Sequence, residues 1–248
     1  MTTQAELAEL VLPAKQARSR IRRDLLLAAG RELLNRDAFE ATSIGDIARE
    51  AGCSVGAFYQ RFPDKEAFFT VVVENVMAEI AADAGRFAAA EASSDAPVER
   101  AIAECVKYWV QTYRRYRGFF RTVMKKTIHS ETSWDPVRRM SPLAVEPFIT
   151  MLATKCGKSD SHVFYYRASA GFQIAFGVML NASLHRTVLL NLDSDELAAW
   201  ATEILRHCLF DELPPALLKH GLGLRPTKSY RMRKLPARRP KGAPQSRK

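Results

Sequence analysis

Residues 43–62 read SIGDIAREAGCSVGAFYQRF, and this stretch decides the fold expected for the N-terminal part of the chain. Ser43 is a residue type that caps helices, and Asp46 follows three residues later, where an acidic side chain can complete a capping box. Gly52 suits the left-handed backbone that ends a helix, and Ser54 can cap the next one. The pattern predicts a helix, a three-residue turn and a second helix that is free to enter a DNA major groove.

The wider pattern around this motif resembles the tetracycline-repressor (TetR) family of transcriptional regulators. The residues that carry the resemblance stand at the spacing of that family: Thr42-Ser43-Ile44, Ile47-Ala48, Ala51-Gly52, Ser54-Val55-Gly56, Phe58-Tyr59, Phe62 and Lys65-Glu66. The resemblance covers about residues 18–75, and beyond residue 80 it is one of architecture alone. Two departures are Gly45, which weakens a helix, and Cys53, where an aliphatic residue is usual.

The resemblance implies how the motif meets DNA. Residues at the helix starts and beside the backbone would hold phosphates, and small residues of the second helix would meet base edges. The implied phosphate contacts are Thr42, Ser43, Ser54, Tyr59 and Lys65, the implied base contacts are Val55, Gly56 and Ala57, and Gln60 can serve either role. Phe58 and Phe62 are expected to pack inward. A regulator of this kind would bind a palindromic double-stranded operator as a homodimer and repress transcription until a small effector releases it, and an activator role stays open.

A run of basic residues without an acid leads into the first expected helix: Lys15, Arg18, Arg20, Arg22 and Arg23. Such an arm can follow a phosphate backbone or enter a minor groove, so Arg18 and Arg20 are further candidate DNA contacts. The alternative is a solvated helix end.

Proline placement indicates an all-α fold. Prolines are missing from 14–62, 64–96, 98–135 and 148–213, and apolar residues in these stretches recur at three- and four-residue spacing. The expected helices cover about 18–35, 43–51, 55–62, 65–90, 97–117, 119–129, 161–185 and 194–210. Asp193 and Glu196 are the expected capping box of the last helix. Residues 134–147 contain two candidate helix starts and remain unassigned.

Four segments follow from this pattern: an N-terminal arm at 1–17, a helix-turn-helix domain at 18–80, a ligand-binding and dimerisation domain at 81–220, and a tail at 221–248. The net charge of +10 lies entirely in the tail, which carries ten basic residues and no acid. The charge excess is therefore no evidence for a folded DNA-binding face. The composition of the tail predicts disorder.

The remaining composition points to a cytoplasmic protein without a membrane partner. Nothing near the start resembles a signal peptide, and no stretch approaches the roughly 18 apolar residues of a membrane span. The four cysteines lie about fifty residues apart with no paired spacing, which indicates reduced thiols rather than disulfides or a zinc site. We expect no cofactor and no metal.

Two apolar stripes predict a dimer interface. They consist of Ala168, Gly171, Ala175 and Val178 in the helix at 161–185, and of Leu197, Trp200 and Ile204 in the helix at 194–210. The resemblance implies that these helices from two subunits form a four-helix interface. A dimer is also expected because one recognition helix reads too few bases. The alternative is that the stripes pack within one chain.

Aromatic residues of the second domain predict an apolar pocket for a hydrophobic or aromatic effector. The candidate lining residues are Trp109, Tyr113, Phe120, Met124, Trp134, Phe148, Phe172 and Phe176. A basic cluster could instead receive an acidic ligand such as an acyl-coenzyme A: Arg114, Arg115, Arg117, Arg121, Lys125 and Lys126. The alternatives are an ordinary core for the first set and a solvated face for the second.

Two other classes of function are alternatives to a regulator. An enzyme is disfavoured because the five histidines stand alone and the chain has neither a glycine-rich phosphate loop nor a nucleophile elbow. The other alternative is an architectural DNA-binding protein without an effector, which a fully packed second domain would favour.

Overall fold

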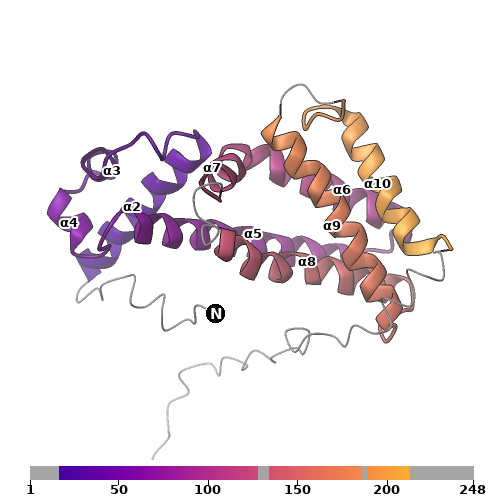
Figure 1. The fold of residues 1–248 in the computed structure, drawn as a ribbon. Helices are drawn as coiled ribbons and strands as arrows, with labels where there is room; N and C mark the ends of the chain where they lie inside the picture. The colour runs from indigo at the N-terminus through magenta and orange to yellow at the C-terminus, as the bar shows by residue number, and fades with distance from the viewer. Residues whose placement is uncertain (1–16, 128–133, 186–188, 213–248) are drawn as a thin grey trace, which may run out of the picture. The chain divides into compact units, whose positions relative to one another are not determined.

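The computed structural model describes residues 17–127, 134–185 and 189–212 (Figure 1). Within these ranges it contains nine helices and no strand, which confirms the predicted all-α class. The helices are α2 (Ala17–Asn35), α3 (Ile44–Glu50), α4 (Val55–Tyr59), α5 (Lys65–Ala92), α6 (Val98–Arg115), α7 (Arg117–Thr127), α8 (Asp135–Lys155), α9 (His162–Leu184) and α10 (Asp195–Phe210). Nearly all of the predicted arm and the whole predicted tail lie outside the described residues.

Phenylalanine rings form the core of the N-terminal helices. Phe58 and Phe62 are fully buried, which confirms that they pack inward. The ring centroid of Phe68, on α5, lies 5.1 Å from that of Phe58 and 4.8 Å from that of Phe62. The first turns of α5 thus complete the core around α3 and α4. The start of this long helix therefore packs in the same core as the helix-turn-helix.

Helix α5 continues from this core along α8. The two helices run in the same direction, because Glu74 pairs with Arg139 near their starts and Phe87 stacks on Phe148 further along. Their buried faces carry most of the packing between them. In Figure 1 the pair extends away from α2, α3 and α4 toward α9 and α10.

The segment at 134–147, which the sequence pattern does not assign, contains the N-cap Trp134 and the first part of the single helix α8. Pro142 and Pro147 lie inside this helix, although an interior proline removes a backbone hydrogen bond and costs about 3 kcal/mol or more. The contacts of α8 with α5 offset this loss, because α8 buries side chains from Val137 to Ala153. Local propensity alone could not reveal that compensation.

The capping box predicted for the last helix is wrong. The N-cap of α10 is Ser194, whose side chain accepts a hydrogen bond from the Leu197 amide. The carboxylate of Asp193 instead accepts a hydrogen bond of 2.6 Å from Arg117, at the start of α7. Both residue types favour N-cap positions, and the available ion pair decides between them.

Three helices end with the same backbone motif, in which one residue adopts a positive φ. Gly52 after α3 has φ +63° and Gly157 after α8 has φ +62°, and Asp37 after α2 has φ +55°. After α2, the Asp37 amide donates to the Leu34 carbonyl and the Ala38 amide to the Leu33 carbonyl, the hydrogen bonds of a Schellman motif. Asp37 is the only residue other than glycine with a positive φ among those that the structure describes.

Helix α7 meets α2 at this end. A Cβ atom on Gly118 would lie 1.7 Å from the carbonyl oxygen of Asn35, so only glycine allows the two backbones to touch here. The hydroxyl of Thr122, one turn further along α7, lies 3.3 Å from the Leu34 carbonyl oxygen. This contact, which we call the α2–α7 joint, fixes α7 against the N-terminal helices.

In the part of the chain that the structure describes, no helix combines the length and apolarity needed to cross a membrane.

The close packing of α2 on α5 yields a test of this core. A Cβ atom on Gly30 would lie 2.7 Å from both Phe68 and Val72, which are buried and cannot withdraw. Gly30→Ala should therefore lower the free energy of unfolding by about 1 kcal/mol or more, despite the better helix propensity of alanine. Gly85→Ala is the matched control, because a Cβ there meets nothing within 4 Å and should raise stability by up to about 1 kcal/mol. Urea unfolding measures both, and a stabilised Gly30→Ala protein would contradict the packing.

Candidate DNA interface

The first short helix is held by its two ends. The Ser43 side chain accepts from the Asp46 amide while the Asp46 carboxylate accepts from the Ser43 amide, so the predicted capping box is present. At the other end, the Gly52 amide donates to Arg49 and the Cys53 amide to Ala48. The chain therefore turns within the four residues 51–54, and α4 begins directly afterwards.

Helix α4 exposes one bare edge. Ser54 caps it by accepting from the Ala57 amide at 3.2 Å, as expected. Val55 and Tyr59 are 44% and 49% exposed, and Gly56 and Gln60 are exposed as well. A glycine beside a small side chain on the first turn lets the backbone approach a groove closely.

Ala57 does not belong to this edge. It was expected among the base contacts, but only 4% of it is exposed, because its place in the helical repeat turns it toward the core beside Phe58. Arg61, which the sequence did not single out, follows one turn later and is also buried, with Nη1 donating to the Ala57 carbonyl at 2.6 Å. No pattern in the sequence marks this arginine as an internal residue.

Three of the expected phosphate contacts already have hydrogen-bond partners within the protein. The Thr42 hydroxyl donates to the Ala38 carbonyl at 2.8 Å, and the Ser43 hydroxyl lies 2.6 Å from the Asp46 carboxylate. Lys65 donates to the Glu40 carbonyl at 2.9 Å and lies over the Phe39 ring. These side chains already have partners within the protein, so their role in binding DNA remains a prediction.

The basic arm is described only in part. The Arg20 side chain is exposed on the first turns of α2, while Arg18 lies in α2 with its side chain outside the description. The Cys53 thiol, in the turn between α3 and α4, lies 4.0 Å from the Arg22 carbonyl oxygen. The start of α2 is therefore next to the turn that precedes the recognition helix.

Six of the predicted effector-pocket residues come together as a ring cluster between α6, α7, α8 and α9. The Trp109 centroid lies 5.5 Å from that of Phe148 and 4.8 Å from that of Phe176, and Tyr113 stacks on Phe120 at 4.4 Å. Phe172 joins the cluster through Phe148 and Phe176, and Met124 and Trp134 are half-buried. Burial raises the pKa of Tyr113, so its phenol stays neutral.

One polar atom of this cluster has no partner. The indole nitrogen Nε1 of Trp109 is buried and donates to no acceptor among the residues that the structure describes. An unsatisfied buried donor costs about 1–3 kcal/mol. The cluster thus contains a donor to which an acceptor could bind with advantage.

A hollow of about 520 Å³ opens beside the ring cluster, where α5 connects to α6. Phe87 lines the hollow and also packs on Tyr108 and Phe148, so it forms a wall between the two. The other lining residues are Glu91, Ser94, Asp95, Ala96, Pro97, Arg100 and Glu104. This rim is charged, unlike the apolar pocket that the sequence suggested.

The residues of the basic cluster proposed for an acidic ligand have partners within the protein. Arg114 donates to the Leu192 carbonyl at 2.6 Å, and Arg117 pairs with Asp193. Arg121 and Lys125 pair with Asp37, Lys126 pairs with Glu40 and Glu66, and Arg115 lies over the Tyr116 ring. These partners within the chain weaken the case for an acyl-coenzyme A, although Arg115 and Lys125 remain exposed to solvent.

The small residues of α9 pack within the chain. Ala168, Gly171 and Ala175 are buried, and a Cβ on Gly171 would lie 2.8 Å from Leu205 of α10. Leu197 is buried as well, whereas Val178 and Ile204 are half-buried. Trp200 keeps 60% of its surface exposed. Other large apolar side chains exposed on these two helices are Val163, Ile174 and Phe210.

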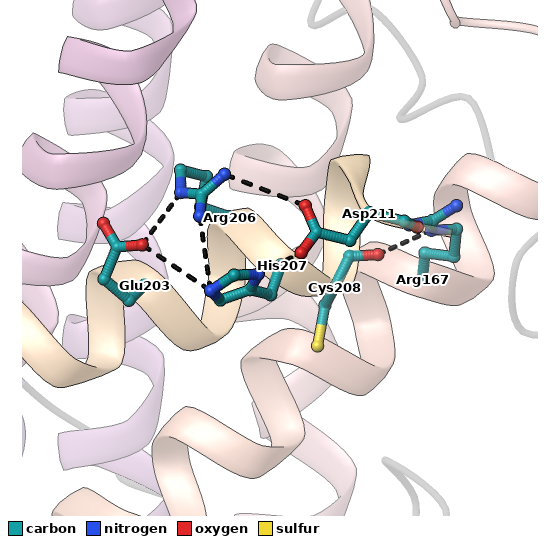
Figure 2. Close-up of polar contacts among 6 residues, drawn as sticks. All are labelled: Arg167, Glu203, Arg206, His207, Cys208 and Asp211. Carbon is teal, nitrogen blue, oxygen red and sulfur yellow. Dashed lines mark hydrogen bonds and ion pairs between the residues drawn. The ribbon is translucent and has the colours of Figure 1, made fainter. Parts of the chain in front are cut away.

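Polar contacts fasten the end of α10 to α9 (Figure 2). Arg167 of α9 donates to the Cys208 carbonyl at 2.5 Å and also to the carbonyl of Asp211. Along α10, Arg206 pairs with Glu203, and His207 lies between Glu203 and Asp211. The cluster explains how these helices stay aligned, and the described residues contain no group of His, Cys, Asp and Glu that could hold a metal.

A short capped helix, a tight turn and an exposed second helix define a helix-turn-helix DNA-binding protein. Residues 26–72 match the model of the family described as bacterial regulatory proteins, tetR family. This part of the chain is therefore a DNA-binding domain of the TetR type.

Solved structures share the fold over most of the chain. A candidate TetR-family transcriptional regulator from Mesorhizobium loti MAFF303099 has a TM-score of 0.62 at 16% identity, covering 78% of this chain and 98% of its own. The fatty acid degradation regulator FadR from Bacillus halodurans has a TM-score of 0.52 at 14% identity, covering 80% and 98%. No curated protein matches the sequence.

Proposed function

We propose that the chain is a repressor that binds a palindromic operator as a homodimer and leaves it when an apolar effector binds. The exposed edge of α4, with Val55, Gly56, Tyr59 and Gln60, is the observation that carries this function. Val55 and Gly56 would meet base edges, while Tyr59 and Gln60 would reach phosphates or an adenine.

The DNA contact is tested at Gly56, where a Cβ meets nothing closer than 3.9 Å, so we expect a larger side chain to leave the fold intact. Gly56→Glu should abolish specific binding, because its carboxylate would face the phosphates of the groove. The operator is first selected from random duplexes with the wild-type chain, and affinities are then measured by gel shift. Gly85→Glu is the control, with the same change of charge on α5. Wild-type affinity of Gly56→Glu, with an unchanged circular dichroism spectrum, would refute the interface.

The dimer is proposed to form through the exposed apolar side chains of α9 and α10. Ile174, Trp200 and Phe210 are 50%, 60% and 45% exposed, and large apolar side chains exposed on two packed helices favour a protein partner. Two copies would present two recognition helices to successive major grooves. The small residues buried between α9 and α10 would then support this face from within.

Trp200→Asp tests this interface, because a dimer would bury an unpaired carboxylate there. Light scattering should report monomers, and operator binding should be lost with the dimer. Leu143→Asp is the matched control, since Leu143 is 54% exposed on α8 and should leave the dimer intact. A full-strength dimer of Trp200→Asp would place the interface elsewhere.

The effector is proposed to be a small aromatic molecule with one hydrogen-bond acceptor, bound among the rings around Trp109. The unpartnered Nε1 supports this, because an acceptor would satisfy it in an apolar setting. The rings pack on one another, so a ligand would have to part them, and Phe87 offers a wall toward the hollow. An effector acts only by binding the DNA-free arrangement more tightly.

Matched pairs of aromatic ketones and their methylidene analogues, such as acetophenone and α-methylstyrene, test this proposal because they differ in the acceptor alone. The ketone should raise the melting temperature more and weaken operator binding by roughly 5- to 150-fold. Trp109→Phe should remove the preference. If no such compound changes either quantity, the architectural reading without an effector is favoured.

A further inference from the structure

Asp37 occupies a backbone position that the same chain fills with glycine elsewhere. The Schellman motifs after α3 and α8 place Gly52 and Gly157 at the positive φ, and only the motif after α2 uses a residue with a side chain. Aspartate is tolerated there better than most residues, but glycine fits without strain. A residue kept in this conformation suggests that its side chain has a task.

The side chain of Asp37 is directed at α7. Its Oδ1 accepts from the Thr122 hydroxyl at 3.0 Å, and its Oδ2 pairs with Lys125 and lies 3.7 Å from Arg121 Nε. Thr122 is 1% exposed and the Asp37 side chain 25%, so these contacts are partly shielded from water. One carboxylate thus contacts three residues on one face of α7, next to the contact of Gly118 with Asn35.

Across the α2–α7 joint, the positive charges lie on α7 and the negative charges lie on the N-terminal side. Helix α7 contains four basic residues and no acid, and the N-terminal helices and their loops supply the carboxylates. Besides the pairs with Asp37, Lys126 lies 2.7 Å from Glu66 and 3.3 Å from Glu40. Among these acids, Asp37 alone also accepts a hydrogen bond from a buried hydroxyl group, that of Thr122. Its carboxylate is therefore attracted to α7 by charge and oriented toward α7 by that hydrogen bond.

We infer that Asp37 is a positioning residue that sets the angle of the helix-turn-helix on α7, and with it the half-site spacing that the dimer accepts. The inference rests on the proposed function, because spacing has meaning only for two subunits on one operator. Each added base pair moves a half-site by about 3.4 Å and turns it by about 35°. A dimer with a firm α2–α7 joint should bind poorly to an operator of altered half-site spacing, whereas a dimer with a loosened joint should tolerate it.

Asp37→Asn is the informative variant. Asparagine also tolerates a positive φ and still accepts from Thr122, so the substitution removes the charge and keeps the shape. Lys125→Gln removes the same ion pair from the other side. Lys107→Gln is the control, because the ion pair of Lys107 with Glu104 lies within α6.

The first measurement is hydrogen exchange of the full-length chain without DNA. Asp37→Asn and Lys125→Gln should speed the exchange of amides in α7 by roughly 2- to 30-fold, and Lys107→Gln should not. Unchanged exchange in α7 overturns the role of Asp37, whether or not the chain binds DNA.

The second measurement compares the selected operator with versions in which one base pair is inserted or removed at the centre. Wild type should discriminate strongly against both, and the two joint variants should lose roughly 2- to 30-fold of that discrimination. A merely structural role would lower affinity for all spacings alike, and that result overturns the inference. If wild type selects no duplex at all, the proposed function fails, while the exchange data still decide whether Asp37 holds α7.

Discussion

The contact between the backbones of α2 and α7 is the constraint on which the arrangement depends. Gly118 brings α7 within reach of the last carbonyl groups of α2, where any Cβ would overlap the Asn35 oxygen. Because α2 packs on α3, α4 and α5, fixing its end also fixes the recognition helix. Because α7 packs on α6 and α9, the same contact ties that helix to the ring cluster. A ligand among the rings and a groove of DNA would therefore act on one joint.

The basic side chains near α7 mainly form ion pairs with acids of the same chain. The basic side chains around the start and end of α7 meet Asp193 on one side and Asp37, Glu40 and Glu66 on the other. Partly exposed ion pairs of this kind contribute little each to stability, typically up to about 1 kcal/mol. They restrict the relative orientation of the helices, however, because a carboxylate that accepts from several donors on one helix can adopt few other positions. The apolar contacts supply stability, and the ion pairs define the angle.

The sequence predicted those features that depend on short-range patterns. The capping box of α3, the turn at Gly52 and the inward packing of Phe58 all follow from residue types at fixed spacing. Long-range packing was beyond its reach. Nothing local shows that α8 continues through Pro142 and Pro147, because the compensating contacts come from α5.

The partners of charged and small residues were equally hidden. The arginines and lysines near Gly118 resemble a solvated or ligand-binding face until the acids from distant segments are placed beside them. The stripe of Ala168, Gly171 and Ala175 suits close helix packing in either setting, and its burial against α10 is decided by the fold alone. Ala57 differs from Val55 and Gly56 only in its angle on a helix of five residues.

The central claim is that two recognition helices are held at a separation matched to DNA by the α2–α7 joint. Pulsed electron–electron double resonance between spin labels at Gln60→Cys in the two subunits measures that separation. The half-exposed Cys53, Cys156 and Cys208 are replaced by serine so that only the introduced cysteine is labelled. On its operator, the dimer should give one narrow distance distribution centred near the 34–36 Å of a helical turn. A broad distribution on the operator, or a centre far from one turn, would contradict the account.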